Sequence, residues 1–201
     1  EEIIKELLAG KDILTVMPTG GGKSLCYQLP ATLFDGLTIV VSPLIALMQS
    51  QVAQLKLLGI KAYCLNSSNS DAENKETMGM LESNEIKLLY VAPERLIKNE
   101  TIDLLKTKKI SLLAIDEAHC ISQWGHDFRK EYLKLGEVRK ELSMVQTIAL
   151  TATADETTRK DIVDKIFPEK PSIFIAGFDR PNIYLSMLPK NKAKEQILSF
   201  I

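Results

Sequence analysis

The stretch Asp116–Glu117–Ala118–His119–Cys120–Ile121–Ser122–Gln123–Trp124–Gly125–His126–Asp127–Phe128–Arg129 follows directly after an apolar run, residues 111–115, in a chain of 201 residues. An apolar run that stops at two adjacent carboxylates is typical of a buried parallel strand that delivers acids to a site. Such strand ends are where open α/β sheets bind ligands. The remainder of the stretch is unusual for a loop, because it holds the only Trp and both His residues of the chain together with a Phe and an Arg.

Apolar segments of strand length alternate with helical patterns along the chain. We expect strands at residues 12–16, 37–41, 61–65, 87–91, 111–115, 145–150 and 172–175, and helices at 1–9, directly after 24, from 42 to 57, and at 71–81, 101–106, 130–140 and 156–166. Ser42 and Pro43 occupy the positions of a helix N-cap and a first-turn proline. The alternation predicts an α/β fold, with a mostly parallel sheet, helices on both faces and right-handed crossovers.

The domain organisation follows from the same pattern. Residues 1–176 form one lobe, and residues 177–201 are expected to lead out of it as a linker, because Pro181 and Pro189 bound an extended stretch. The sequence begins, at Glu1, within an expected amphipathic helix, and residues 192–201 resemble the first turns of another helix. We therefore expect the chain to be a piece of a longer protein.

Composition excludes several classes of protein. Lys and Arg number 25 against 26 for Asp and Glu, and a net charge of −1 neither suggests nor excludes a nucleic-acid partner, since a phosphate-tracking groove needs only local basic groups. Cys26, Cys64 and Cys120 are odd in number and far apart, which supports neither a disulfide framework nor a zinc knuckle. They fit a reducing compartment, cytoplasmic in a bacterium or nuclear in a eukaryote. No apolar run approaches membrane-spanning length.

A glycine-rich loop, Met17–Pro18–Thr19–Gly20–Gly21–Gly22–Lys23–Ser24, joins the first expected strand to a helix. This context favours phosphate binding, because glycines let successive N–H groups face one anion and the helix N-terminus adds partial positive charge. Lys23 is expected to reach the terminal phosphates of a nucleotide, and Ser24 to offer its hydroxyl to Mg²⁺. The usual pattern has Gly where this chain has Met17, so the strict motif fails at one position. A plain glycine-rich turn is the alternative.

The acid pair supplies the second element that a nucleotide site needs. Asp116 fits the strand-end acid that holds Mg²⁺ beside the phosphates. Glu117 should point elsewhere and is the candidate to orient and deprotonate the attacking water. Its alternative is a solvated loop acid, and the pair becomes a strong signal only together with Lys23 and Ser24.

These segments resemble a known family. Residues 17–24, Asp116 to His119 and Thr151–Ala152–Thr153–Ala154 are similar to motifs I, II and III of a superfamily-two helicase, whose first motif commonly begins without Gly. Four further segments resemble those of RecQ DNA helicases: residues 41–48, 91–96, 120–129, which matches the aromatic-rich loop, and 177–183. Two departures flank these motifs, Ser50 where the family usually has Asp and Lys130 where it usually has Pro.

The resemblance implies two RecA-like P-loop NTPase lobes with ATP and Mg²⁺ between them and single-stranded DNA across their tops. Residues 1–176 would be the first lobe, and residues 177–201 the linker and start of the second. The implied activity is ATP-dependent 3′–5′ unwinding at duplex junctions, in DNA repair or recombination. The adenine-recognising Gln would lie just before Glu1, and the arginine finger in the second lobe, so we expect weak ATP turnover by this chain alone. No zinc is expected in these residues.

The resemblance also implies a set of residues that contact DNA or couple it to hydrolysis. They are Ser42, Asn66, Ser67, Arg95, His119, Gln123, Trp124, Phe128, Arg129, Thr151 and Thr153.

Each of these assignments has an alternative. Trp124 and Phe128 would share one face of a helical turn, where they could be two core aromatics instead of a base-stacking pair. Ser42 could be a helix cap alone. Motif II implies that His119 bridges the nucleotide to Thr151 or Thr153. A zinc site of His119, Cys120 and His126 is disfavoured, because no fourth ligand recurs at a plausible spacing.

Two other functions remain open from the sequence. A DEAH-box RNA helicase would share residues 116–119 but is not expected to carry Gln123–Trp124–Gly125–His126. A nucleotide-gated nucleic-acid-binding module without turnover is disfavoured for the parent protein by Lys23, Ser24, Asp116 and Glu117, but stays open as a description of this fragment alone.

Overall fold

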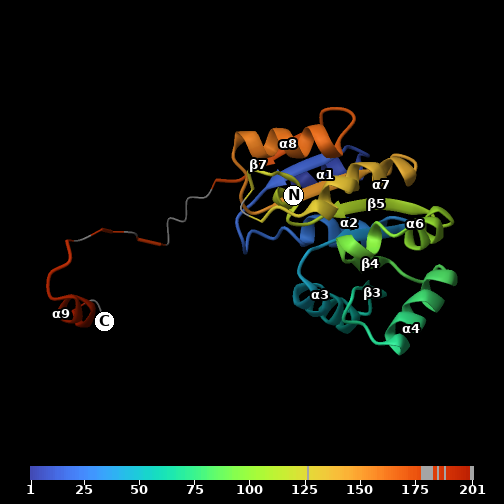
Figure 1. Cartoon of the computed structure of the whole chain (residues 1–201), viewed down its shortest axis with the longest axis horizontal. Coiled ribbons are helices and arrows are strands. Elements are labelled where there is room, and N and C mark those ends of the chain that lie inside the picture. The colour runs from blue at the N-terminus through green and yellow to red at the C-terminus, as the bar shows by residue number, and fades with distance from the viewer. Residues whose placement is uncertain (126, 178–182, 185, 188, 200–201) are drawn as a thin grey trace.

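In the computed structural model, residues 1–125, 127–177, 183–184, 186–187 and 189–199 are described. Within these residues seven strands form one sheet in the order β3-β4-β2-β5-β6-β1-β7, and every pairing is parallel (Figure 1). The strands are β1 (Ile13–Val16), β2 (Leu37–Val41), β3 (Ala62–Leu65), β4 (Leu88–Val91), β5 (Ile110–Ile115), β6 (Thr147–Thr151) and β7 (Ser172–Ile175). The predicted α/β class is confirmed.

Helices cover both faces of the sheet (Figure 1). They are α1 (Glu2–Leu8), α2 (Leu25–Leu33), α3 (Ile45–Leu57), α4 (Asp71–Glu82), α5 (Pro93–Leu96), α6 (Asn99–Lys106), the 3-10 helices η1 (Ala118–Ile121) and η2 (Lys130–Lys134), α7 (Leu135–Glu141), α8 (Glu156–Ile166) and α9 (Ala193–Leu198).

Alternation along β5 divides the interior into two cores. Leu112 and Ala114 face a cluster formed with α1, α2 and α3, whereas Leu113 and Ile115 face one formed with α4 to α8. Successive side chains of a strand point to opposite faces, so a strand buried on both sides reads as continuously apolar. The sheet thereby holds the end of β5, with its two acids, in the middle of the molecule.

Two helix predictions differ from the structure. Residues 130–140 form η2 followed by α7 and not one helix, and the short helix α5 was not predicted. Gly136 is constrained by packing at this point, since a Cβ there would lie 2.1 Å from the backbone oxygen of Lys165 in α8. Close approach of α7 to α8 therefore requires a residue without a side chain.

The predicted N-cap at Ser42 is wrong. Helix α3 begins at Ile45 after Leu44, and Pro43 lies outside it. The backbone N–H of Ser42 instead donates to Val91 O at 3.3 Å, which extends the pairing of β2 with β4. The Ser42 hydroxyl is buried without a hydrogen-bond partner among the described residues.

The C-terminal segment leads away from the sheet (Figure 1). Of the RecQ-like segment at residues 177–183, residues 178–182 lie outside the described residues, and α9 buries no side chain.

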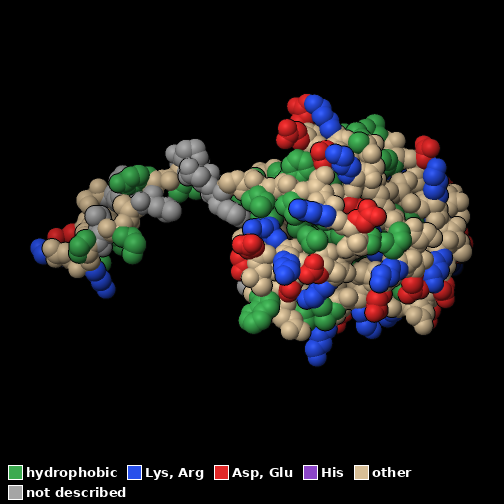
Figure 2. Space-filling view, turned by 90° about the horizontal axis from the view of Figure 1, so that it is seen from above, with side chains coloured by type: hydrophobic (Ala, Val, Ile, Leu, Met, Phe, Trp, Pro, Cys, Tyr) green, Lys and Arg blue, Asp and Glu red, His purple; other side chains and the backbone are tan. Residues whose placement is uncertain are grey.

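No helix among the described residues is long and apolar enough to cross a membrane. On the face drawn in Figure 2, basic and acidic side chains are interspersed, in keeping with the near-zero net charge.

Replacing Gly136 by Ala should destabilise the lobe by about 1–3 kcal/mol, because its Cβ meets backbone that can yield only by moving α8. Gly79→Ala is the matched control, since Gly79 lies within α4 with no atom near the added Cβ. That control should gain about 0.5–1 kcal/mol from helix propensity. Urea unfolding measures both changes, and equal effects of the two substitutions would contradict the packing of α7 on α8.

Candidate active site

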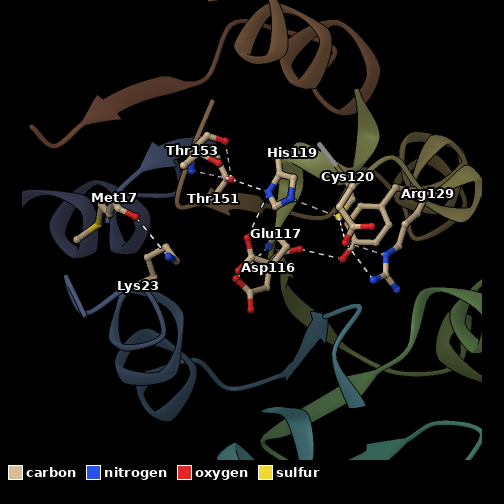
Figure 3. Close-up of polar contacts among 11 residues, drawn as sticks. Met17, Lys23, Asp116, Glu117, His119, Cys120, Arg129, Thr151 and Thr153 are labelled. Atoms are coloured by element: carbon tan, nitrogen blue, oxygen red, sulfur yellow. Dashed lines mark hydrogen bonds and ion pairs between the residues drawn. The ribbon is translucent and has the colours of Figure 1, made fainter. Parts of the chain in front are cut away.

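The glycine-rich loop continues the sheet and then turns sharply. Met17 N donates to Thr151 O at 3.0 Å, just beyond the end of β1. Gly20 and Gly22 adopt φ values of 82° and 83°, which L side chains rarely tolerate. Lys23 Nζ donates to Met17 O at 3.3 Å, so its ammonium group lies over the loop (Figure 3). The loop thus places backbone N–H groups, an ammonium and the start of α2 together, as phosphate binding requires.

Asp116 lies at the carboxyl end of β5 and is 8% exposed. Its backbone N–H donates to Val41 O at 2.9 Å, and Tyr132 Oη donates to its carbonyl at 2.9 Å. Burial and the neighbouring Glu117 carboxylate raise the pKa of Asp116 to about 6, although the positive charge of Lys23 opposes the shift. A buried carboxylate facing an ammonium is suited to a divalent cation, which would replace the solvation that it has lost.

The backbone conformation of Glu117 directs its carboxylate away from that of Asp116. Its φ of 48° and ψ of 45° are left-handed, a strained conformation for a residue other than Gly. Glu117 N donates to Asp116 Oδ1 at 3.0 Å, while Glu117 Oε2 lies 3.3 Å from His119 Nδ1. The turn therefore sends adjacent carboxylates in different directions, as the sequence predicted for two distinct roles.

His119 connects the end of β5 to the end of β6. Its Nδ1 lies 2.9 Å from Thr151 Oγ1 in a buried contact (Figure 3). The Thr151 hydroxyl donates to Thr153 O at 3.1 Å, so its oxygen must accept from His119. His119 is therefore protonated on Nδ1, and motif II and motif III residues share one hydrogen-bonded chain. The contact expected between His119 and Thr151 is present, and its role towards a nucleotide stays a prediction.

The aromatic loop follows without a break. Trp124 is 77% exposed, Gln123 is exposed and Phe128 is half-buried, so the interpretation of two core aromatics is wrong for Trp124. The flanking residues 122–125 and 127–129 are turn and irregular structure, and the helical turn assumed for this pair is not found there. His126 lies outside the described residues. The indole of Trp124 is therefore open to contact with a partner.

The base of this loop is held firmly. Ser122 is fully buried, donates to Asp161 Oδ2 at 2.8 Å and accepts from Trp124 N at 3.2 Å. A Cβ on Gly125 would lie 2.6 Å from His119 O, so the loop packs directly against η1. A rigid base with an exposed aromatic tip presents Trp124 to a partner without a large entropic cost.

Arg129 links the loop to the segment after β2. Its guanidinium pairs with Asp127 Oδ2 at 3.0 Å and donates through Nη1 to Pro43 O at 3.2 Å. Sequence reasoning quoted Asp127 and Pro43 only as members of longer segments and gave them no part in the site, and it missed the buried Tyr132 altogether. A carboxylate two positions before an arginine was the only available signal for Asp127.

The four predicted backbone-contacting residues all follow strand ends on the same edge of the sheet. Ser42 follows β2, Asn66 and Ser67 follow β3, and Arg95 lies in α5 after β4. Asn66 is buried, and its Oδ1 accepts from Ser68 N at 2.8 Å, so this amide shapes its own loop. Ser67 is exposed and Arg95 is half-buried. A cleft lined by Pro43, Leu44, Glu117, His119, Asp127, Ala152 and Thr153 runs along this edge.

A family model described as DEAD/DEAH box helicase matches residues 1–162. The chain belongs to this family. Over its whole length the chain is 49% identical to "ATP-dependent DNA helicase RecQ" of Pasteurella multocida, of which it covers 32%. It is 42% identical to "ATP-dependent DNA helicase Q1" of Rattus norvegicus, again over its whole length, and covers 33% of that protein. The resemblance to RecQ helicases is thereby confirmed. The chain spans about a third of the length of the curated relatives it matches.

Solved structures support the fold of this helicase-family lobe. The Hef helicase domain of Pyrococcus furiosus superposes with a TM-score of 0.66 at 18% identity, over 90% of this chain and 38% of that one. The DEAD-box helicase Mss116, bound to ssRNA and UDP-BeF, gives a TM-score of 0.67 at 19% identity, over 87% of this chain and 38% of that one. These likenesses confirm the RecA-like lobe architecture.

Asp116→Asn should stabilise this lobe at pH 7. A folded-state pKa near 6 exceeds the unfolded value of 3.8, so the folded state binds the proton more tightly and stability falls as pH rises between these values. Above pH 6 the full cost of the buried charge is present, on the order of 2–3 kcal/mol. Asn removes that charge, and its advantage should disappear near pH 4, where Asp116 is protonated.

Denaturant unfolding at pH 7 and pH 4 measures this effect. Asp35→Asn is the control, since the Asp35 side chain is 88% exposed and its removal should change little at either pH. An Asp116→Asn variant less stable than wild type at pH 7 would show that the carboxylate is compensated within the fold.

Proposed function

We propose that this chain is the first motor lobe of an ATP-dependent 3′–5′ DNA helicase of the RecQ type, which binds Mg-ATP, contacts single-stranded DNA and couples hydrolysis to unwinding. The observation that carries the proposal is that one segment, residues 116–129, holds both the acid pair at the end of β5 and the exposed Trp124. The names and the identity of the RecQ relatives support it.

In this proposal the residues of the loop and the acid pair divide the chemistry. The N–H groups of residues 17–24 and the ammonium of Lys23 bind the phosphates. Ser24 and Asp116 offer a hydroxyl and a carboxylate, the hard oxygen ligands that Mg²⁺ prefers. Bound Mg²⁺ would neutralise charge that develops on the phosphates. Glu117 orients and deprotonates the attacking water.

The DNA partner is proposed from the loop and the strand-end residues. Trp124 and Phe128 would stack on bases, which is tolerant of sequence because every base has a π-face. Ser42, Ser67, Arg95 and Arg129 would contact the backbone, since hydroxyls and guanidinium groups bind phosphate without reading bases. Asn66 would support these contacts by shaping its loop. Gln123, His119, Thr151 and Thr153 would carry the effect of DNA to the acid pair.

A second RecA-like lobe of the same parent protein is the expected partner across the nucleotide, because the relatives are about three times as long as this chain. It would supply the arginine finger. Residues 1–176 would then be the first lobe, with residues 177–201 leading into the second. Three free cysteines suit a reducing compartment, cytoplasmic in a bacterium or nuclear in a eukaryote.

An RNA helicase is the alternative, because Mss116 shares the fold and its structure holds ssRNA. The RecQ-like loop at residues 120–129 argues for DNA. ATP hydrolysis by the full-length parent, measured with single-stranded DNA and then with single-stranded RNA, distinguishes the two. Stimulation by DNA is expected, and stimulation by RNA alone would contradict the proposal. The absence of turnover with either would favour a nucleotide-gated binding module.

The 201-residue chain by itself should hydrolyse ATP slowly. Loss of a transition-state arginine in related phosphoryl transfer costs on the order of 10³-fold or more. Phosphate release by the purified chain, compared with the parent saturated with DNA, measures the difference. A chain that turns over as fast as the parent would contradict the assignment of the arginine to a second lobe.

Trp124→Ala in the parent should leave nucleotide binding unchanged but reduce DNA-stimulated hydrolysis about 5- to 150-fold, given 1–3 kcal/mol for a stacked base. Leu57→Ala is a matched control, because Leu57 is an apolar side chain that is 88% exposed at the end of α3, outside the loop. Steady-state ATPase at saturating ATP with varied DNA checks both variants. Normal stimulation in Trp124→Ala would mean that the loop does not sense DNA.

A further inference from the structure

Three side chains with metal-binding atoms, two from η1 and one from the remainder of the aromatic loop at residues 120–129, lie close together. Cys120 Sγ lies 3.8 Å from His119 Nε2 (Figure 3). It also lies 3.9 Å from Asp127 Oδ2, and the three atoms lie within 4.8 Å of one another. Glu117 and Thr151 contact the other ring nitrogen of His119. The cluster is thus adjacent to the proposed water-orienting acid but uses different atoms.

The tautomer of His119 prepares it as a ligand. Because Thr151 Oγ1 donates to Thr153 O, it accepts the proton of His119 Nδ1, and in the neutral imidazole this leaves the lone pair on Nε2, which faces the Cys120 thiol. Glu117 Oε2 lies 3.3 Å from the same Nδ1. A carboxylate beside the non-ligating nitrogen is the arrangement that orients histidine in metal sites and raises its basicity.

We propose that His119 Nε2, Cys120 Sγ and Asp127 Oδ2 form a binding site for a divalent cation that accepts sulfur and nitrogen ligands, Zn²⁺, with water as the fourth ligand. Thiolate, imidazole and carboxylate are the zinc ligands of proteins, and three of them with one open position is a common set. Metal–ligand bonds of about 2.0–2.3 Å at tetrahedral angles place ligand atoms roughly 3.3–3.8 Å apart. Two of the observed separations are already close to that range.

The remaining separation can close by rotation of Asp127, whose side chain is 48% exposed. The cleft along the sheet edge is lined by His119 and Asp127, two of the three proposed ligands. Burial raises the pKa of the Cys120 thiol to about 12, so the cation must displace the thiol proton to solvent. One S–H bond breaks and one metal–sulfur bond forms, and no electron is transferred.

The third ligand is Asp127 and not His126, the residue that was considered from the sequence. The sequence paired His119 and Cys120 with His126 and disfavoured zinc for want of a fourth ligand. The structure places Asp127 beside the thiol instead. A bound ion would tie η1 to the loop and compete with Arg129 for Asp127, and this binding does not depend on the proposed function.

Titration of the 201-residue chain with Cd²⁺ tests the site directly, because cadmium–thiolate bonds absorb in the ultraviolet. One ion per chain is expected, with the absorption lost in Cys120→Ser and kept in the matched variants Cys26→Ser and Cys64→Ser. Zn²⁺ should displace Cd²⁺, whereas excess Mg²⁺, which prefers oxygen ligands, should not. Absorption that survives in Cys120→Ser would overturn the proposal.

Asp127→Asn separates a three-ligand site from a lone thiolate. Asp127 is exposed, so this variant should keep the stability of wild type, whereas Cys120 is fully buried and its replacement can affect folding. The affinity for Cd²⁺ should fall at least about tenfold, the lower limit seen even for groups that only support a ligand. Equal affinity in Asp127→Asn and wild type would overturn the proposed site.

Discussion

The left-handed turn at Glu117 is the constraint on which the site depends. Two adjacent carboxylates at the end of a central strand repel one another, and the charge of Glu117 helps to raise the pKa of Asp116. The strained backbone at φ 48° sends Asp116 into the buried end of the sheet and Glu117 towards His119. Strain of this kind persists where surrounding contacts over-determine it, and here the hydrogen bonds of Tyr132 and Val41 hold Asp116 on one side of the turn.

Beyond that turn, the same segment becomes a bridge between strand ends. His119 joins β5 to β6 through Thr151, Ser122 anchors the loop to α8, and Arg129 reaches Pro43 in the segment after β2. The first of these bonds connects the end of β5, with its acid pair, to motif III, and the other two fix the position of the loop. Displacement of Trp124 by a partner would therefore be felt at Glu117 through few and well-packed intermediates.

The parallel sheet and the positions of both motifs were predictable, because buried strands read as apolar runs and turns as glycine clusters. The helix at residues 156–166 and the strands at 37–41 and 172–175 were predicted to the residue. Contacts that depend on tertiary packing were not predictable. The cap at Ser42 failed because the backbone N–H of Ser42 pairs with β4, and the close approach of Gly136 in α7 to Lys165 in α8 joins residues far apart in the sequence. Asp127 gave only a weak signal, a carboxylate two positions before Arg129, because its contact with the buried Cys120 depends on how the loop folds back.

The central claim is that residues 116–129 act as one unit in which DNA contact at the loop reaches the acid pair through His119. A double-mutant cycle in the parent protein, Trp124→Ala with His119→Asn, tests this most directly when read as DNA-stimulated ATP hydrolysis. Residues that act through one another should give non-additive losses, so the double variant should be little worse than the worse single variant. Losses that simply add would show that Trp124 and His119 act independently, and would contradict the account.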